Sequence, residues 1–299
     1  WDAGEFARTH DVYIGSTFAD VNNAGQADAA GLLVSQGQSD TAYDPGRLEF
    51  GQTYYWRVDE VNAPPDSTIY KGEVWSFEVE PLAYPIGGVT VTASSSEPGV
   101  GPEQTIDGSG LDENGLHSIN AADMWLSGMA GEQPTTITYE FDRVYKLHEM
   151  LVWNYNVQFE MFLGYGIKDA TVEYSENGVD WTVLGDFEFA QGVSQSGYAA
   201  NTAVDFGGAS VQAVRLTANS NWGGVFEQYG LSEVRFLYIP TIAREPAPGD
   251  GATGLDPATT LSWRAGREAG THEVYLGTDP SALPLVDAVG DASYDADLG

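Results

Sequence analysis

Two stretches of the sequence combine aromatic rings with side-chain amides, the mixture on which sugar-binding sites depend. A pyranose has an apolar face on which an exposed aromatic can stack, and planar polar groups beside that ring read its hydroxyls. The first stretch, VWNYNVQFEMF, covers residues 152–162, and the second, NSNWGGVFEQYG, covers residues 219–230. They supply these candidate ligand contacts: Asn154, Asn156, Phe159, Asn219, Asn221, Trp222, Phe226 and Tyr229.

The same residues also have structural interpretations, because aromatic residues of β-proteins commonly pack in the core. Trp153 ends an alternating segment and is expected to be buried, whereas Phe159 and Phe226 fit a core or a surface position equally well. Trp222 precedes Gly223-Gly224, which favours a sharply turning, exposed loop tip. The asparagines of the first stretch alternatively satisfy backbone groups of a loop.

A third stretch, TIDGSGLDENGLHS at residues 105–118, is rich in oxygen ligands. Calcium takes about six to eight oxygens, mixing carboxylates with backbone carbonyls on an irregular loop. The stretch is not an EF-hand, because Asp107, Ser109 and Leu111 break the alternating oxygen pattern of that motif. Two interpretations stay open here, a calcium loop and an acidic surface turn.

Motifs of the familiar catalytic classes are missing from the sequence. There are no cysteines, and the 4 histidines form no ligand pair of the HxH or HExxH kind, so thiolate chemistry and zinc are not expected. The chain has no GxSxG, phosphate loop or dinucleotide fingerprint. Its 44 acidic residues produce carboxylate pairs by chance, so a glycosidase pair cannot be recognised. We therefore expect no enzyme and assign no catalytic residue.

The formal net charge of −32, from 44 acidic and 12 basic residues, argues against negatively charged partners. Nucleic acid requires a Lys/Arg surface, and anionic lipid attracts basic segments, so neither partner is expected. The acidic residues are spread along the chain, which favours a solvated surface over a saline habitat or cation binding as their explanation. No apolar run of about 18 residues predicts a membrane span.

Short alternating segments predict the elements that position these residues. TITYEF at residues 136–141 places Ile137, Tyr139 and Phe141 on one face of a strand. An Asn-Gly turn at Asn177 joins two further segments as a hairpin. No stretch keeps a helical period, so the class is all-β, a sandwich or jelly roll. The other predicted strands are residues 170–175, 181–184, 202–206, 213–217 and 233–236.

The order of TIDG, MWLSG, YEFDRVYKLHEMLVWN, YGIKDATVEYSENGVDWTVL, VRLTANSNWGG and SEVRF resembles the discoidin domain, also called the coagulation factor 5/8 type C domain. It is similar too to the galactose-binding-like carbohydrate-binding modules. The resemblance covers residues 89–236. It implies a central β-sandwich jelly roll, an extracellular or cell-surface location, and ligand binding by loops at one end. It does not fix the ligand, because the family spans sugars, lipids and proteins.

The resemblance also implies a structural calcium ion. Similar modules hold one with the Asp of the IDG turn and the Glu of the last strand, which are Asp107 and Glu233 here. Asp112 is a further candidate ligand. The loop is longer than the usual turn, and Ser109 stands where an Asp is common, so the ligand set departs from the family pattern.

The flanks of the central domain contain an internal repeat. WDAGEFARTHDVYIGS at residues 1–16 aligns without gaps to WRAGREAGTHEVYLGT at residues 263–278, with nine identical positions. The YYWRVDEVN…VWSFEV run resembles the last strands of fibronectin type III-like domains. We therefore predict partial immunoglobulin-like or fibronectin type III-like β-sandwiches at residues 1–81, which lack a first strand, and at residues 258–299. The resemblance places a discoidin domain at residues 86–238, and we predict a Pro/Gly-rich linker over residues 239–257.

Three functions fit these features. The first is a non-catalytic carbohydrate-binding or adhesion module of a secreted or cell-surface protein, with a glycan or polysaccharide as partner. The second is a structural repeat unit of a fibre, filament or surface layer, whose partners are neighbouring domains or copies of the same repeat. The third is an accessory domain of a polysaccharide-degrading enzyme.

Overall fold

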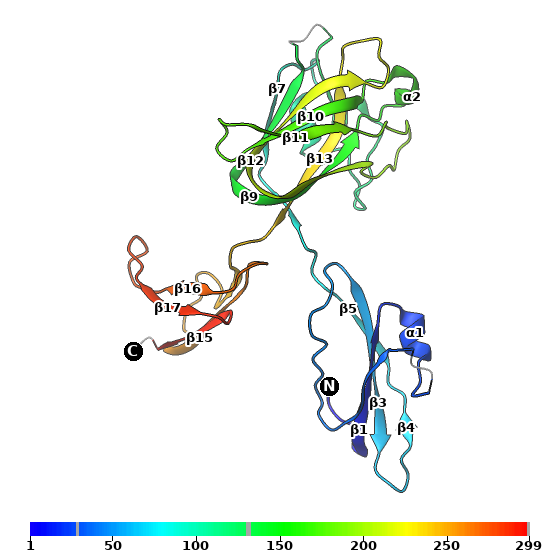
Figure 1. Ribbon diagram of the computed structural model, residues 1–299, viewed down its shortest axis with the longest axis vertical. Helices are drawn as coiled ribbons and strands as arrows, with labels where there is room; N and C mark the ends of the chain where they lie inside the picture. Colours follow the sequence, from blue (N-terminus) through cyan, green and yellow to red (C-terminus); the bar gives the residue numbers. More distant parts are fainter. Residues whose placement is uncertain (28–29, 130–132, 298–299) are drawn as a thin grey trace. The chain divides into compact units, whose positions relative to one another are not determined.

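The computed structural model describes residues 1–27, 30–129 and 133–297, and it is almost entirely antiparallel β-structure. The chain divides into two compact units, Trp1–Leu82 and Ala83–Gly299, of which the second contains the central sandwich (Figure 1). Within the described ranges, no helix has both the length and the apolar character needed to cross a lipid bilayer. The expected all-β class is confirmed.

The first unit is one five-stranded sheet in the order β2-β1-β3-β4, with β5 also pairing with β3. Helix α1 (Phe18–Asn23) covers one face through the buried Val21. Arg57 is fully buried beneath it, where its guanidinium lies 2.7 Å from Asp59 and donates to the carbonyl oxygen of Val21. A buried charge is tolerated only with such partners. The strands are β1 (Ala7–Gly15), β2 (Leu33–Gln38), β3 (Thr53–Asn62), β4 (Ile69–Tyr70) and β5 (Val74–Glu78).

The central sandwich is built around two long strands, β9 (Thr136–Asn154) and β12 (Thr202–Asn221). Their pairing register shifts between Asp205 and Ala209 and again between Val211 and Ala213. Each long strand therefore has different neighbours along its length: the first half of β9 pairs with β7 and its second half with β13. Bulges of this kind bend strands, so one sheet supplies both layers.

The order of that sheet is β11-β10-β12-β9-β13-β6, with β7 on β9 and β8 on β13. The remaining elements are β6 (Tyr84–Pro85), β7 (Thr90–Ala93), β8 (Trp125–Leu126), β10 (Ile167–Ser175), β11 (Thr182–Glu188), β13 (Gly230–Ile239), α2 (Glu160–Leu163) and the 3-10 turns Pro102–Thr105 and Ala121–Asp123.

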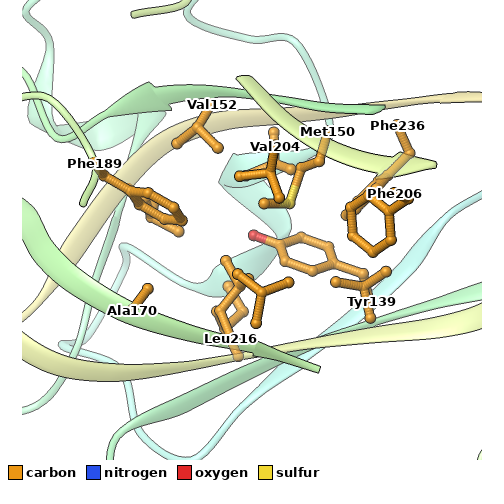
Figure 2. Packing of buried hydrophobic residues seen from close by; sticks show 14 of the residues in the cluster. Tyr139, Met150, Val152, Ala170, Phe189, Val204, Phe206, Leu216 and Phe236 are labelled. Atoms are coloured by element: carbon orange, nitrogen blue, oxygen red, sulfur yellow. The ribbon is translucent and has the colours of Figure 1, made fainter. Parts of the chain in front are cut away.

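One hydrophobic cluster fills the space between the two layers. Tyr139, at the centre of the predicted TITYEF strand, points into it with Met150, Phe206 and Leu216 around its ring (Figure 2). Its ring meets that of Phe236 edge to face at 5.1 Å. The predicted inward alternation of this strand is confirmed, as is the burial of Trp153.

Residues 240–297 form two small sheets, β14-β15-β18 and β16-β17. The predicted linker is wrong for Arg244–Ala247, which form β14 and pair with β15. The acidic end of the chain also pairs, as β17 with β16 and β18 with β15. The strands are β15 (Ala258–Arg264), β16 (His272–Tyr275), β17 (Leu285–Val289) and β18 (Ser293–Asp297).

Candidate ligand-binding site

The two aromatic stretches meet at one end of the sandwich, where residues 155–166 link β9 to β10 and residues 222–229 link β12 to β13. Figure 1 shows α2, in the first loop, beside the yellow loop that precedes β13. The backbone N–H of Gly223 donates to the carbonyl oxygen of Gly164 at 2.8 Å, and that of Trp222 donates to Gly166 at 3.2 Å. Gly164 has a φ of 65°, and a Cβ there would lie 2.1 Å from the Gly223 nitrogen. Only glycine permits this approach.

These paired loops carry a group of exposed apolar side chains, which we call the apolar tip. Phe162 is 89% exposed, Phe159 59% and Phe226 52%. Met161 and Val225 complete the group and are also largely exposed. Exposed apolar groups gathered in one place mark interaction sites, because water disfavours them unless a partner covers them. Sequence reasoning identified Phe159 and Phe226 but missed the other three, although an uninterrupted apolar run, MFL at residues 161–163, stands in the loop after β9.

The predicted asparagine contacts are instead the supports of the loops, because three of the four are buried. Asn154 donates from Nδ2 to the carbonyl oxygens of Ile167 and Ala190, at 2.7 and 2.9 Å. Asn156 donates to Gln195 and accepts from the N–H of Ser194. Asn221 donates to Phe226 and Gln228 and accepts from Gly224. The burial of these three amides favours the alternative interpretation, in which they satisfy backbone groups of the loops.

Three further predictions differ from the observed positions. Trp222 is only partly exposed, because its indole N–H donates to the carbonyl oxygen of Phe189 and Lys168 lies over its ring at 5.4 Å. Tyr229 is buried in the core cluster, so it is not a surface contact. Asn219 is exposed but lies on β12, where it donates to Thr171 Oγ1 on the neighbouring strand.

Glu160, which sequence reasoning missed, is the buried acid that closes the first loop. Its carboxylate accepts from the backbone N–H of Gly166 at 2.7 Å and of Tyr165 at 3.2 Å. Burial raises the pKa of this carboxyl to about 7, and the two hydrogen bonds work against that rise. The two hydrogen bonds to backbone groups of its own loop make this carboxyl a structural support.

The predicted calcium residues fall into two groups. Glu233 on β13 is fully buried, and its Oε2 accepts from the N–H of Gly108 at 3.3 Å. Its burial raises the pKa of its carboxyl to about 7, and the nearby charge of Asp107 adds to that rise. Asp112 closes a separate turn, where its Oδ1 accepts from the N–H groups of Asn114 and Leu116. Asp112 therefore belongs to a different turn from Asp107 and Glu233.

The carboxylates of Glu233 and Asp107 are groups that can bind calcium, but the guanidinium of Arg235 also lies beside Glu233. Glu233 Oε1 is buried and accepts no well-directed hydrogen bond, while Arg235 Nε lies 2.7 Å from it. In the described ranges, no three His, Asp or Glu side chains gather as a metal cluster. Calcium would need most of its oxygens from backbone carbonyls of the 105–118 loop.

Comparison with known proteins gave only structural similarities: no family model matches the chain, and no curated protein matches it. A family 32 carbohydrate-binding module of a Clostridium perfringens family 31 glycoside hydrolase is similar, with 17% identity and a TM-score of 0.40, covering 52% of this chain and 95% of that one. The family 32 module of C. perfringens NanJ, in complex with galactose, has 18% identity and a TM-score of 0.37, covering 52% and 98%. A family 89 glycoside hydrolase from C. perfringens, in complex with GlcNAc-α-1,4-galactose, has 14% identity and a TM-score of 0.37, covering 51% of this chain but 14% of that chain. At such low similarity, a function has to be argued from the site itself.

Proposed function

We propose that the central sandwich is a non-catalytic carbohydrate-binding module of an extracellular or cell-surface protein, and that the apolar tip contacts the glycan. One observation carries this proposal: three exposed phenylalanine rings lie on two loops that are hydrogen-bonded to each other. The buried amides and Glu160 hold those loops in place, so the rings are presented on a fixed base. Preorganised rings lose little entropy when a ligand binds.

The chemistry of the tip favours a neutral glycan. A phenylalanine ring can cover the apolar face of a sugar, and the exposed Gln158 and Glu227, next to Phe159 and Phe226 in the sequence, can bond hydroxyls. The net charge of −32 repels sulfated or uronic-acid polymers over a Debye length of about 8 Å at physiological salt. We therefore propose neutral polysaccharides as the partner class.

A glycan array followed by calorimetry tests this function. Phe159→Ala and Phe226→Ala are each expected to weaken binding about fivefold, because a stacked ring contributes on the order of 1 kcal/mol. Phe6→Ala, in the first unit, is the matched control, because Phe6 is a 72% exposed phenylalanine outside the sandwich. Equal melting temperatures would show that the tip variants are folded. Failure to bind any neutral glycan, or equal losses in the control, would contradict the proposal.

The proposal includes a structural calcium ion held by Glu233 and Asp107. The support is the buried carboxylate of Glu233, one oxygen of which lacks a directed hydrogen bond, with a second carboxylate close by. Bound calcium would neutralise both groups and stabilise the fold by mass action. We expect calcium to raise the melting temperature and excess chelator to lower it; no change with either would remove the ion from the proposal.

We also propose fibronectin type III-like spacers for the flanking segments. The support is their antiparallel sheets and the internal repeat that relates them. In that arrangement the chain would serve as an accessory module of a polysaccharide-degrading enzyme.

A further inference from the structure

The tripeptide Glu-Asn-Gly occurs twice in the central sandwich, at residues 113–115 and at residues 176–178. An asparagine followed by glycine can lose its side-chain ammonia without an enzyme, because no side chain shields the glycine nitrogen. Both asparagines are exposed, and both glycines are left-handed, with a φ of 71° for Gly115 and 74° for Gly178. The two sites therefore share their local sequence and the conformation of their glycine.

The side chain of Asn177 is held in place by its surroundings. Its Oδ1 accepts from the backbone N–H groups of Val179 and Asp180, each at 2.9 Å, and its Nδ2 donates to the Asp180 carboxylate at 2.9 Å. The hydroxyl of Ser175 donates to the same Oδ1 at 3.2 Å and accepts from the N–H of Gly178 at 2.9 Å. The amide group and the glycine nitrogen that would attack it are thus both bound to other partners.

Asn114 lacks these restraints, because the side chain of Asp112 organises its turn instead. The carboxylate of Asp112 accepts from the N–H groups of Asn114 and Leu116, both at 2.9 Å. The N–H of Gly115 donates to the carbonyl oxygen of Asp112 at 3.0 Å. In the part of the chain that the structure describes, the side-chain amide of Asn114 makes no hydrogen bond. It is therefore free to rotate toward the nitrogen of Gly115.

We infer that Asn114 is a site of spontaneous deamidation and that Asn177 is protected from it. The nitrogen of Gly115 attacks Cγ of Asn114, so a C–N bond forms while the bond from Cγ to the side-chain nitrogen breaks. The proton of the Gly115 nitrogen leaves with that NH₂ group as ammonia, and a cyclic succinimide remains. Water then opens the ring at either of its carbonyl carbons, which gives aspartate or isoaspartate. Water is the only other reactant, and nothing is oxidised or reduced.

Isoaspartate would lengthen the main chain at a point where this loop is attached to the sandwich. The carbonyl oxygen of Gly115 accepts from Nε1 of Trp153 at 3.1 Å, and Trp153 is buried near the end of β9. The backbone N–H of His117 donates to the carbonyl oxygen of Tyr198 at 2.8 Å. In isoaspartate the main chain runs through the former side-chain carbonyl, so one carbon is added directly before Gly115 and displaces it from these partners. A buried indole N–H that loses its acceptor destabilises the fold.

Peptide mass spectrometry of the full chain, kept for days in neutral buffer at physiological temperature, tests the inference. Exchange of NH₂ for OH raises the mass of the peptide that contains Asn114, and chromatography separates aspartate from isoaspartate. We expect Asn114 to react at least about tenfold faster than Asn177, because two or more hydrogen bonds must break before Asn177 can react. Equal rates in the folded chain, or a faster rate at Asn177, would overturn the inference.

The second Glu-Asn-Gly site provides a matched control. In urea both sites are unfolded and should react at similar rates, whereas a difference that persists there would assign the effect to sequence instead of structure. Asp180→Ala, an exposed substitution, removes the acceptor of the Asn177 amide and should accelerate reaction at Asn177 severalfold while leaving Asn114 unchanged. An unchanged rate at Asn177 would show that these hydrogen bonds do not protect it.

The melting temperature tests the consequence for the fold. It should fall in the parent chain as isoaspartate accumulates and stay constant in Asn114→Gln, because glutamine has to close a larger ring and reacts more slowly. Hydrogen exchange should increase across residues 105–118 of the aged parent chain alone. Equal ageing of the two chains would overturn the link between Asn114 and the anchoring of this loop.

Discussion

Replacing Glu160 by Gln should remove a defined part of the pH dependence of stability. Glu160 is fully buried, and its carboxyl has a pKa raised from 4.5 to about 7 by that burial. The difference between the two values corresponds to about 3 kcal/mol of unfolding free energy. Glutamine keeps the shape and stays neutral at every pH, but its one oxygen can accept from only one of the N–H groups of Gly166 and Tyr165. The lost hydrogen bond lowers stability equally at all pH values and leaves the difference in pH dependence unchanged.

The direction in which stability changes with pH follows from whether the folded or the unfolded chain holds the proton. Below about pH 4.5 the carboxyl is protonated in both the folded and the unfolded chain, and its full stabilising effect is present. Between pH 4.5 and about 7 the unfolded chain releases the proton while the folded chain keeps it, so stability falls as pH rises. Above about pH 7 both states are ionised and the loss is complete. The carboxyl of Glu233 adds a similar loss in the same range.

Urea unfolding at intervals between pH 4.5 and 8 measures this effect. The parent chain should lose about 3 kcal/mol more than Glu160→Gln across the range, which is roughly 6 to 12 °C in melting temperature for a domain of this size. Glu227→Gln is the matched control, because it removes one exposed carboxylate from the adjoining loop. If Glu160→Gln kept the parent pH profile, or if the control flattened it equally, burial of Glu160 would not be the cause.

Two further predictions concern the supports of the site. Asn221→Ala removes the amide that donates to the carbonyl oxygens of Phe226 and Gln228 and accepts from the N–H of Gly224. It should lower the free energy of unfolding by about 3 kcal/mol and increase hydrogen exchange across residues 222–228. Unchanged exchange would show that Asn221 does not support this loop. Arg235→Gln removes the guanidinium beside Glu233, so calcium should raise the melting temperature of this variant more than that of the parent chain; an equal response in both would show that Arg235 does not compete with the ion.

The sequence by itself determined the class of the fold and its repeated parts. Alternation in TITYEF showed that Ile137 and Tyr139 share a face, because successive residues of a strand point to opposite sides. The alignment of residues 1–16 with residues 263–278 identifies a duplicated piece without any tertiary information. Both are local properties of the chain, and the structure keeps both.

Only the tertiary structure decided which side chains face water at the end of the sandwich. Asn154 reads as a loop amide, but its partners Ile167 and Ala190 come from later in the chain and enclose it. Trp222 sits in a sharp turn as expected, yet the carbonyl oxygen of Phe189 holds its indole against the sandwich. Alternation and turn signals say which way a residue points, whereas its burial depends on segments that the fold brings over it. The exposed rings of the apolar tip are what remains after those distant segments have covered the rest.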